Sequence, residues 1–247
     1  MNKAIYLTFL TIVCVFVPAG TTNAQSIEEA RTLYTEGRFT EAAELAQSLD
    51  TLEGYALAAN SLAIYSYYMA PDGEKEGSFR RAVELAQKAI LLDNSNPEAY
   101  LQLAHAMGRL AQVTGTWEAL NEGYAGQVRD AIQEALRLAP DMAAAHLSLA
   151  AWHAGVVGAA GFMAGLLYDA NEEDALAHFE RALELAPQEK IVLLEYALGS
   201  LALDVDANRA KAHDLLERAI ALPAKDAYDR ILHQKAVEQL AALLGLS

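Results

Sequence analysis

The sequence predicts an all-α protein, an α-solenoid of about five helix-pair repeats with a C-terminal cap helix. The first observation is a small residue that recurs in one expected helix after another, at Ala42, Ala82, Val128, Ala175 and Ala212. Each has a partner seven residues later on the same helix face, at Leu49, Ala89, Ala135, Ala182 and Ala219. The second observation is composition. The 247 residues are 53% hydrophobic and rich in Ala and Leu, and they include only 6 prolines, which favours helices.

The first two repeats begin close to the N-terminus. The first runs from Ser26 to Asp50 and bends at Gly37. The second begins near Leu52. The segment Pro71-Asp72-Gly73 is typical of a turn. We therefore expect a loop from Ala70 to Gly77 and a new helix from Phe79.

The later repeats carry insertions. The marker residues are 40, 46, 47 and 37 positions apart, and the excess falls between the two helices of a repeat. The third repeat opens at Asn96-Pro97-Glu98, a favourable helix start, and has an insertion centred on residues 114–117. The fourth opens after Pro140-Asp141, with an insertion from Ala154 to about Asn171. A fifth repeat precedes the cap helix, residues 226–244.

These markers resemble the second-helix signature of the tetratricopeptide repeat (TPR). The elbow glycines Gly37 and Gly123 and the Ala-Pro endings at Pro140 and Pro187 add to the match, which covers most of residues 26–222. The resemblance implies a right-handed TPR-type solenoid, a fold whose usual role is to hold another molecule.

Two narrower resemblances concern residues 79–203. Tyr124 to Asp141, followed by His146, Trp152-His153 and a long hydrophobic elbow, looks like exported bacterial TPR proteins related to the regulator-of-microtubule-dynamics family. The layout is also similar to the periplasmic TPR subunits of TRAP transporters. The first resemblance implies a scaffold, and the second implies the handling of a small apolar ligand.

Residues 1–24 are typical of a secretory signal peptide. Lys3 is followed by an apolar stretch from Ala4 to Val17, and Thr22-Asn23-Ala24 offers small residues for cleavage after Ala24. The apolar stretch is shorter than the ~20 residues that span a bilayer. We therefore expect an exported, periplasmic TPR domain over residues 25–247, without stable membrane insertion after cleavage. Cys14 is the only cysteine, so the mature chain would have no disulfides or thiolate chemistry.

The formal net charge of −15 disfavours nucleic acid and anionic membrane surfaces, because phosphates would be repelled. No P-loop, dinucleotide fingerprint or nucleophile elbow is present. His146 and His153 share a helix face without a nearby acidic ligand, which favours packing over metal binding. The sequence therefore predicts neither an enzyme nor a cofactor or metal site.

The first helix of each repeat should line the concave wall. The repeat register predicts Tyr67 and Tyr68 in the second repeat, with Ile64 beside them. It predicts His105 and Arg109 in the third repeat, together with Leu101. The candidate binding residues on this wall are Tyr67, Tyr68, Tyr100, His105, Arg109, Leu194, Leu198 and Leu201. The wall is thus expected to become almost wholly apolar toward the C-terminus.

An exposed apolar wall of this kind has three explanations. It holds an apolar ligand or a peptide helix, it joins copies of the protein into a homo-oligomer, or an insertion fills it with Trp117, Phe162 or Met163. The glycine-rich elbow from Gly155 to Tyr168 is either a packed helix extension or a lid.

The sequence therefore predicts a non-catalytic exported scaffold that binds a protein or peptide partner in its groove. The alternative is a carrier of a small apolar ligand, in which Leu194, Leu198, Leu201 and the elbow should line one pocket.

Overall fold

The computed structural model describes residues 19–161 and 163–245, and within them every regular element is a helix. The predicted signal peptide lies mostly outside the described residues, and the proposed cleavage position after Ala24 falls within the first helix. The helices, in order, are α1 (Ala19–Glu36), α2 (Phe39–Ser48), α3 (Leu52–Tyr68), α4 (Asp72–Leu92), α5 (Pro97–Val113), α6 (Thr116–Asn121), α7 (Tyr124–Leu138), α8 (Ala143–Ala160), α9 (Met163–Tyr168), α10 (Glu172–Leu185), α11 (Lys190–Leu203), α12 (Val205–Ala221) and α13 (Ala227–Leu243).

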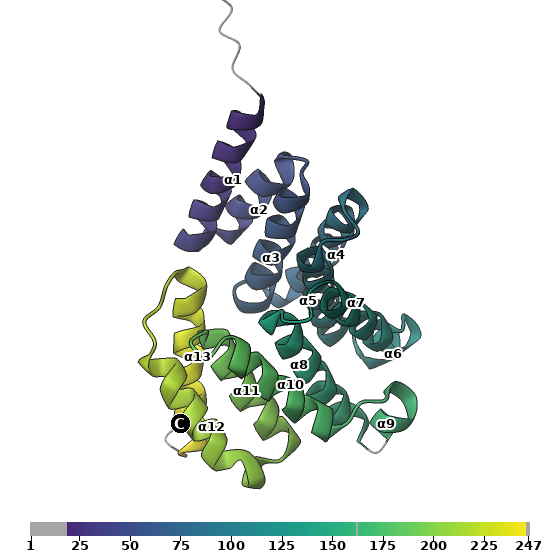
Figure 1. Cartoon of the computed structure of the whole chain (residues 1–247), viewed down its shortest axis with the longest axis vertical. Coiled ribbons are helices and arrows are strands. Elements are labelled where there is room, and N and C mark those ends of the chain that lie inside the picture. Colours follow the sequence, from purple (N-terminus) through teal and green to yellow (C-terminus); the bar gives the residue numbers. More distant parts are fainter. Residues whose placement is uncertain (1–18, 162, 246–247) are drawn as a thin grey trace, which may run out of the picture.

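The helices form five antiparallel pairs stacked into a curved solenoid (Figure 1). The pairs are α1/α2, α3/α4, α5/α7, α8/α10 and α11/α12. The first helices pack side by side, α3 on α5 and α8 on α11, and thus form the inner wall. The right-handed TPR-type solenoid predicted from the sequence is confirmed.

The recurring small residues lie where second helices pack against their neighbours. The residues in this set that are fully buried are Ala42, Ala82, Ala89, Ala135, Ala175, Ala182, Ala212 and Ala219. Alanine at these positions lets helix axes approach closely, and larger partners such as Phe179 fill the space between layers. The recurring small residues in the sequence therefore mark the positions where helices contact each other.

Several helix boundaries follow from capping residues. The Asn96 side chain accepts a hydrogen bond from the Ala99 amide (3.1 Å), and Pro97 occupies the first turn of α5 as predicted. Asp226 caps α13 in the same way, with the Asp229 amide as donor (2.8 Å). The predicted cap helix is therefore present with nearly its expected limits.

The loop predicted from Ala70 to Gly77 is wrong in extent. The chain turns only at Met69 to Pro71, and α4 already begins at Asp72. Proline at the helix entrance and acidic residues Asp72 and Glu74 in the first turn favour helix initiation. The same residues that indicate a turn therefore also start the helix.

Each of the two insertions contributes a short helix, and the second also lengthens α8 as far as Ala160. Helix α6 contacts α5 and α7, and α9 packs against α8. None of the described helices combines the length and apolarity needed to cross a membrane.

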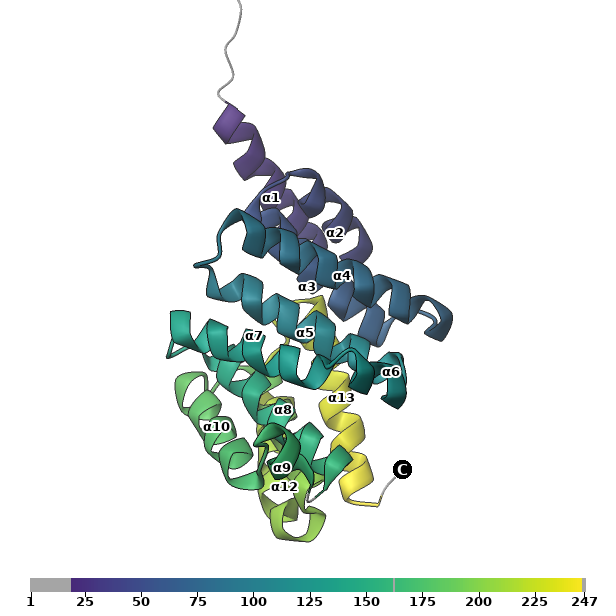
Figure 2. The same ribbon diagram turned by 90° about the vertical axis from the view of Figure 1, so that its right-hand side faces the viewer.

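Helix α13 does more than cover the last repeat. It packs against α12 and α11 and also contacts α1, so the two ends of the solenoid meet (Figures 1 and 2). Gly37, in the turn between α1 and α2, has φ +89°, and a Cβ there would lie 2.8 Å from the Ala227 Cβ. The approach of α13 to the first repeat therefore requires glycine at this turn.

Candidate functional site

The centre of the concave face is a cluster of two tyrosines, an arginine and a glutamate. Tyr67 and Tyr68, at the end of α3, meet edge to face with ring centroids 4.6 Å apart. The Arg109 guanidinium, from α5, lies 3.8 Å from the Tyr67 ring centroid, a cation–π arrangement. Tyr67 is still 40% exposed. The structure thus brings together three of the predicted wall residues.

Arg109 also faces Glu195 of α11, at 3.9 Å between Nη2 and Oε1. The Arg109 and Glu195 side chains are 29% and 24% exposed. Burial raises the pKa of the Glu195 carboxyl, while Arg109 partly offsets this shift. The pair joins the third repeat to the fifth across the groove. We call Tyr67, Tyr68, Arg109 and Glu195 the tyrosine–arginine centre.

His105 lies one helical turn before Arg109 on α5. Its Nε2 is 2.8 Å from Ser148 Oγ of α8, and this hydroxyl donates to the Ala144 carbonyl (2.8 Å). The hydroxyl oxygen must therefore accept from His105 Nε2–H. Burial, reinforced by the nearby Arg109 charge, lowers the pKa of His105 to about 4. His105 is thus a neutral hydrogen-bonded wall residue at neutral pH.

Helix α13 closes one side of this centre. Tyr228 contacts Tyr68 with ring centroids 5.9 Å apart, and Ala227 is buried with Phe39 and Ile64. Burial raises the pKa of Tyr68 to about 12 and that of Tyr228 well above its usual value. Both phenols therefore act as neutral packing groups.

A pocket of ≈ 510 Å³ opens where the two ends of the solenoid meet. We call it the seam pocket. Its lining residues come from α1 to α3 and from α13: Glu36, Gly37, Phe39, Tyr68, Met69, Ala227, Arg230, Ile231, Gln234 and Lys235. Met69 is 53% exposed. Because Tyr68 belongs to both, the seam pocket adjoins the tyrosine–arginine centre.

The apolar C-terminal wall predicted from Leu194, Leu198 and Leu201 is not what the structure shows. Leu194 is 1% exposed and lies in the core around Phe179, and Leu198 and Leu201 pack against that core. Glu195 faces the groove instead. It is the only charged residue from Ile191 to Leu203, which is the signal that could have identified it.

The predicted position of Tyr100 on the wall is also wrong, whereas the packing of the elbow agrees with the packed helix extension that was one of its two interpretations. Tyr100 packs with a separate core around Trp152 and Tyr124, away from Tyr67. Part of the elbow from Gly155 to Tyr168 joins that same core, through Val156, Val157, Ala164 and Tyr168. The single pocket expected for a carrier is therefore not formed by these residues. Of the proposed plugs, Phe162 and the Trp117 side chain lie outside the described residues.

A histidine cluster lies between α8 and α10. The Nδ1 atoms of His146 and His178 are 2.9 Å apart, and His146 Nε2 donates to the Pro140 carbonyl (2.9 Å). The ring centroids are 5.1 Å apart. This is the separation expected when the two Nδ1 atoms lie on the line between the ring centres. The nitrogens therefore point at each other and share a hydrogen bond, instead of converging on an ion.

The third histidine of the cluster is also hydrogen-bonded. His153 Nδ1 accepts from the Asn171 amide (3.2 Å), and its ring meets Trp152 edge to face at 4.9 Å. His178 is half-buried. Within residues 19–161 and 163–245, no group of three or more histidine, cysteine or acidic residues is arranged to hold a metal.

Comparison with known proteins gives one family match. The family model described as regulator of microtubule dynamics protein 1-3 matches residues 26–244. The match covers all five repeats and α13. No curated protein matches the chain significantly.

Solved structures of TPR proteins are similar to the chain. The thermophilic TPR protein TTC0263 from Thermus thermophilus is 19% identical, with a TM-score of 0.61 over 87% of this chain and 99% of that one. YrrB, described as a TPR protein with an unusual peptide-binding site, is 15% identical, with a TM-score of 0.40 over 86% and 90%. The human IFIT1 dimer with PPP-AAAA is 17% identical, with a TM-score of 0.49 over 91% and 56%. The likeness to TTC0263 establishes the TPR fold.

Proposed function

The chain belongs to the regulator of microtubule dynamics protein 1-3 family, and we propose that it is a non-catalytic TPR scaffold that binds a protein or peptide partner on its concave face. The tyrosine–arginine centre and the adjoining seam pocket are the binding surface. The predicted export to the periplasm is part of the proposal and rests on the sequence of residues 1–24.

One observation carries the proposal, namely that large side chains are left exposed in the tyrosine–arginine centre and the seam pocket. Tyr67 and Met69 are 40% and 53% exposed, yet Tyr67 is held between Tyr68 and the Arg109 guanidinium. Tyrosine, methionine and arginine are enriched at the centres of protein interfaces. A side chain that is already fixed loses little conformational entropy on binding.

Catalysis at this centre is disfavoured because its titratable side chains are already engaged with neighbouring residues. His105 is kept neutral by burial and engaged with Ser148, and Glu195 is engaged with Arg109. The Ser148 hydroxyl beside His105 donates its proton to the Ala144 carbonyl, so His105 is its hydrogen-bond donor and not a base that would activate it. These contacts orient the wall and support a binding role.

Site-specific photocrosslinking in the native cell tests the proposal. A photoreactive phenylalanine analogue is placed at Tyr67, and at Leu91 as the control, since Leu91 is 84% exposed at the end of α4. We expect discrete crosslinked products from position 67, absent from position 91 and lost on Met69→Asp. Equal crosslinking from both positions, or none from position 67, would contradict the use of this groove.

A further inference from the structure

The rim of the seam pocket carries a cation without a partner. The Arg230 side chain makes no hydrogen bond, ion pair or ring contact within the described part of the chain. Every other lysine and arginine of that part contacts a carboxylate, a neutral oxygen or an aromatic ring. In a chain of net charge −15, where acids outnumber bases, such an unpaired guanidinium is unusual.

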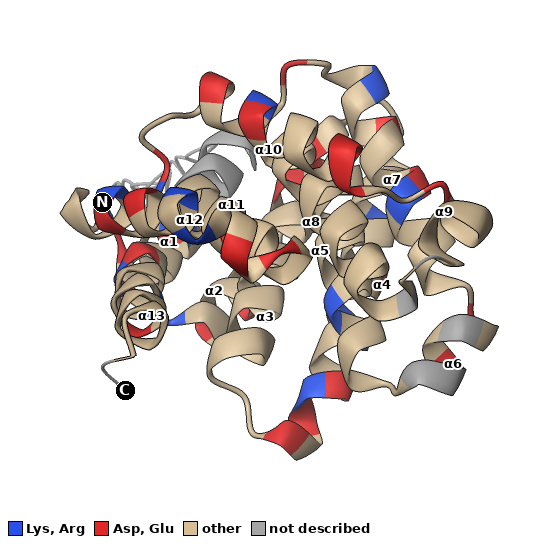
Figure 3. Ribbon diagram, turned by 90° about the horizontal axis from the view of Figure 1, so that it is seen from below, with Lys and Arg blue, Asp and Glu red and all other residues tan. Residues whose placement is uncertain are grey.

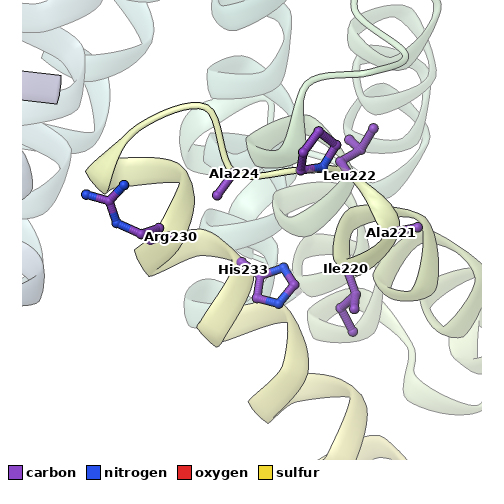
Figure 4. Close-up of a pocket in the computed structure, with 7 residues that line it drawn as sticks. Ile220, Ala221, Leu222, Ala224, Arg230 and His233 are labelled. Atoms are coloured by element: carbon purple, nitrogen blue, oxygen red, sulfur yellow. The ribbon is translucent and has the colours of Figure 1, made fainter.

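The orientation of the Arg230 side chain assigns it to the seam pocket and not to the second pocket that it borders. Arg230 also borders a second pocket of ≈ 430 Å³ between α12 and α13. Figure 4 shows its side chain extending from α13 away from His233 and from the α12 residue Ile220. The guanidinium is therefore free for a group that enters from outside the α12–α13 contact.

The neighbours of Arg230 supply both charge and apolar surface. Residues 230, 231, 234 and 235 share one face of α13 and all line the seam pocket. Lys235 and Gln234 also line the rim, although both contact Glu238 of the same helix, while Ile231 joins Met69 on the apolar side.

The lining of the seam pocket holds one acidic residue, on the opposite rim. Glu36 is the acidic member of the lining, and it pairs with Arg38 at 3.4 Å. Arg230 and Lys235 outnumber this one carboxylate, so the lining residues carry a net positive charge. Elsewhere, acidic and basic residues are interspersed along the helices (Figure 3).

We propose that the seam pocket accepts a peptide segment of the partner in which Asp or Glu adjoins Leu, Phe or Trp. The carboxylate pairs with Arg230, which can bind it through two parallel hydrogen bonds. The apolar side chain covers Met69 and Ile231, and the segment continues toward Tyr67 along Tyr68. This inference rests on the proposed function and specifies the chemistry of the partner.

The acidic surface of the protein makes this contact selective. A partner carboxylate is repelled over most of a surface with net charge −15 and attracted at the one cation that has no side-chain partner within the described residues. The contact thereby fixes the orientation of the bound segment. The volume of the seam pocket, ≈ 510 Å³, falls within the usual range for sites that bind small groups and suits a short stretch of chain.

Binding of defined peptide libraries to the immobilised full chain tests the inference. One library holds fluorescein-labelled dodecapeptides in which Asp or Glu adjoins Leu, Phe or Trp, and the matched library has Asn or Gln at the acidic positions. The proteins compared are wild type, Arg230→Gln, Tyr67→Ala and the control Arg137→Gln. Arg137 is an exposed arginine of α7, paired with Glu134.

We expect wild type and Arg137→Gln to retain the acidic library about tenfold better than the amide library at low salt. Arg230→Gln should lose this preference. Equal retention of both libraries by wild type, or an unchanged preference in Arg230→Gln, would overturn the inference. In that case, loss of binding on Tyr67→Ala would still support the concave groove as the binding surface. Retention of neither library by wild type would count against both proposals.

Discussion

His105 should make the stability of the protein depend on pH in a defined window. Burial lowers its pKa to about 4, whereas an unfolded histidine titrates near 6.5. Between these two values the unfolded chain binds more protons than the folded one, so stability falls as the pH decreases. Above about pH 6.5 the contribution is complete.

The size of the effect follows from the two pKa values. A difference of about 2.5 units corresponds to about 3 kcal/mol when the full window is crossed, at 1.36 kcal/mol per unit. Lowering the pH from 7 to 5 crosses only part of this window, which corresponds to about 2 kcal/mol. Because water reaches part of His105, we expect a measured loss of about 1–2 kcal/mol.

The substitution His105→Gln isolates this contribution. Glutamine retains an N–H donor for Ser148 Oγ but does not titrate. The free energy of unfolding would be measured in urea at pH 7 and pH 5, by circular dichroism at 222 nm, with the denaturant dependence checked for two-state behaviour. His213→Gln is the matched control, since His213 lies on the surface of α12 beside Glu217.

The expected result is a pH dependence that is flatter by about 1–2 kcal/mol in His105→Gln and unchanged in His213→Gln. The same slope in wild type and His105→Gln would refute the reasoning. So would a nuclear magnetic resonance titration that placed the His105 pKa near 6.5.

Three further substitutions test the packing that positions the groove. Gly199→Ala should lower the free energy of unfolding by about 1–3 kcal/mol, because the added Cβ would overlap the buried Phe179 ring; a thermal midpoint equal to wild type would contradict this. Gly37→Ala should cost about 1–3 kcal/mol through its positive φ and its clash with Ala227, and hydrogen exchange should accelerate at the start of α13; protection equal to wild type there would show that α13 does not depend on this turn. Lys190→Met keeps the aliphatic stem but removes the buried ammonium, which donates to the Ala219 and Leu222 carbonyls at 2.8 and 2.7 Å. We expect the free energy of unfolding in urea to fall by about 1–3 kcal/mol. An unchanged midpoint would mean that water replaces both hydrogen bonds.

The repeats could be predicted from the sequence because their signals are local. A small residue such as Ala82 marks a helix contact wherever it occurs, and Asn96 followed by Pro97 starts a helix without help from distant residues. These features depend on spacing within one helix or one turn. The number of repeats and the position of the cap helix follow from them.

The inner wall was predicted less well because it depends on rotation about each helix. A shift of one residue turns the side chain by about 100°. That shift is the difference between Leu194, which is buried, and Glu195, which faces Arg109. The structure brings the predicted residues Tyr67, Tyr68 and Arg109 together. The register of the second repeat was uncertain by one residue, but Tyr67 and Tyr68 are adjacent, so the prediction tolerates that shift.

The closure of the solenoid could not be predicted at all from local patterns. In an open solenoid each repeat contacts only its neighbours, and stability is a sum of adjacent terms. Here the contact of Ala227 and Tyr228 with Phe39 and Tyr68 joins the last helix to the first two repeats. Whether two ends meet depends on the curvature summed over all the repeats, including those lengthened by insertions.

Closure also explains which groups remain available for a partner. It covers Tyr228 and Tyr68 in part, and these rings would otherwise extend the aromatic surface of the groove. It leaves Tyr67 and Met69 exposed on one side of the contact and brings Arg230 to the other. The apolar and the cationic parts of the proposed binding surface come from opposite ends of the chain. A partner that spans them therefore binds the closed form more tightly than an open one, and its binding should stabilise the contact between α13 and the first repeat by mass action.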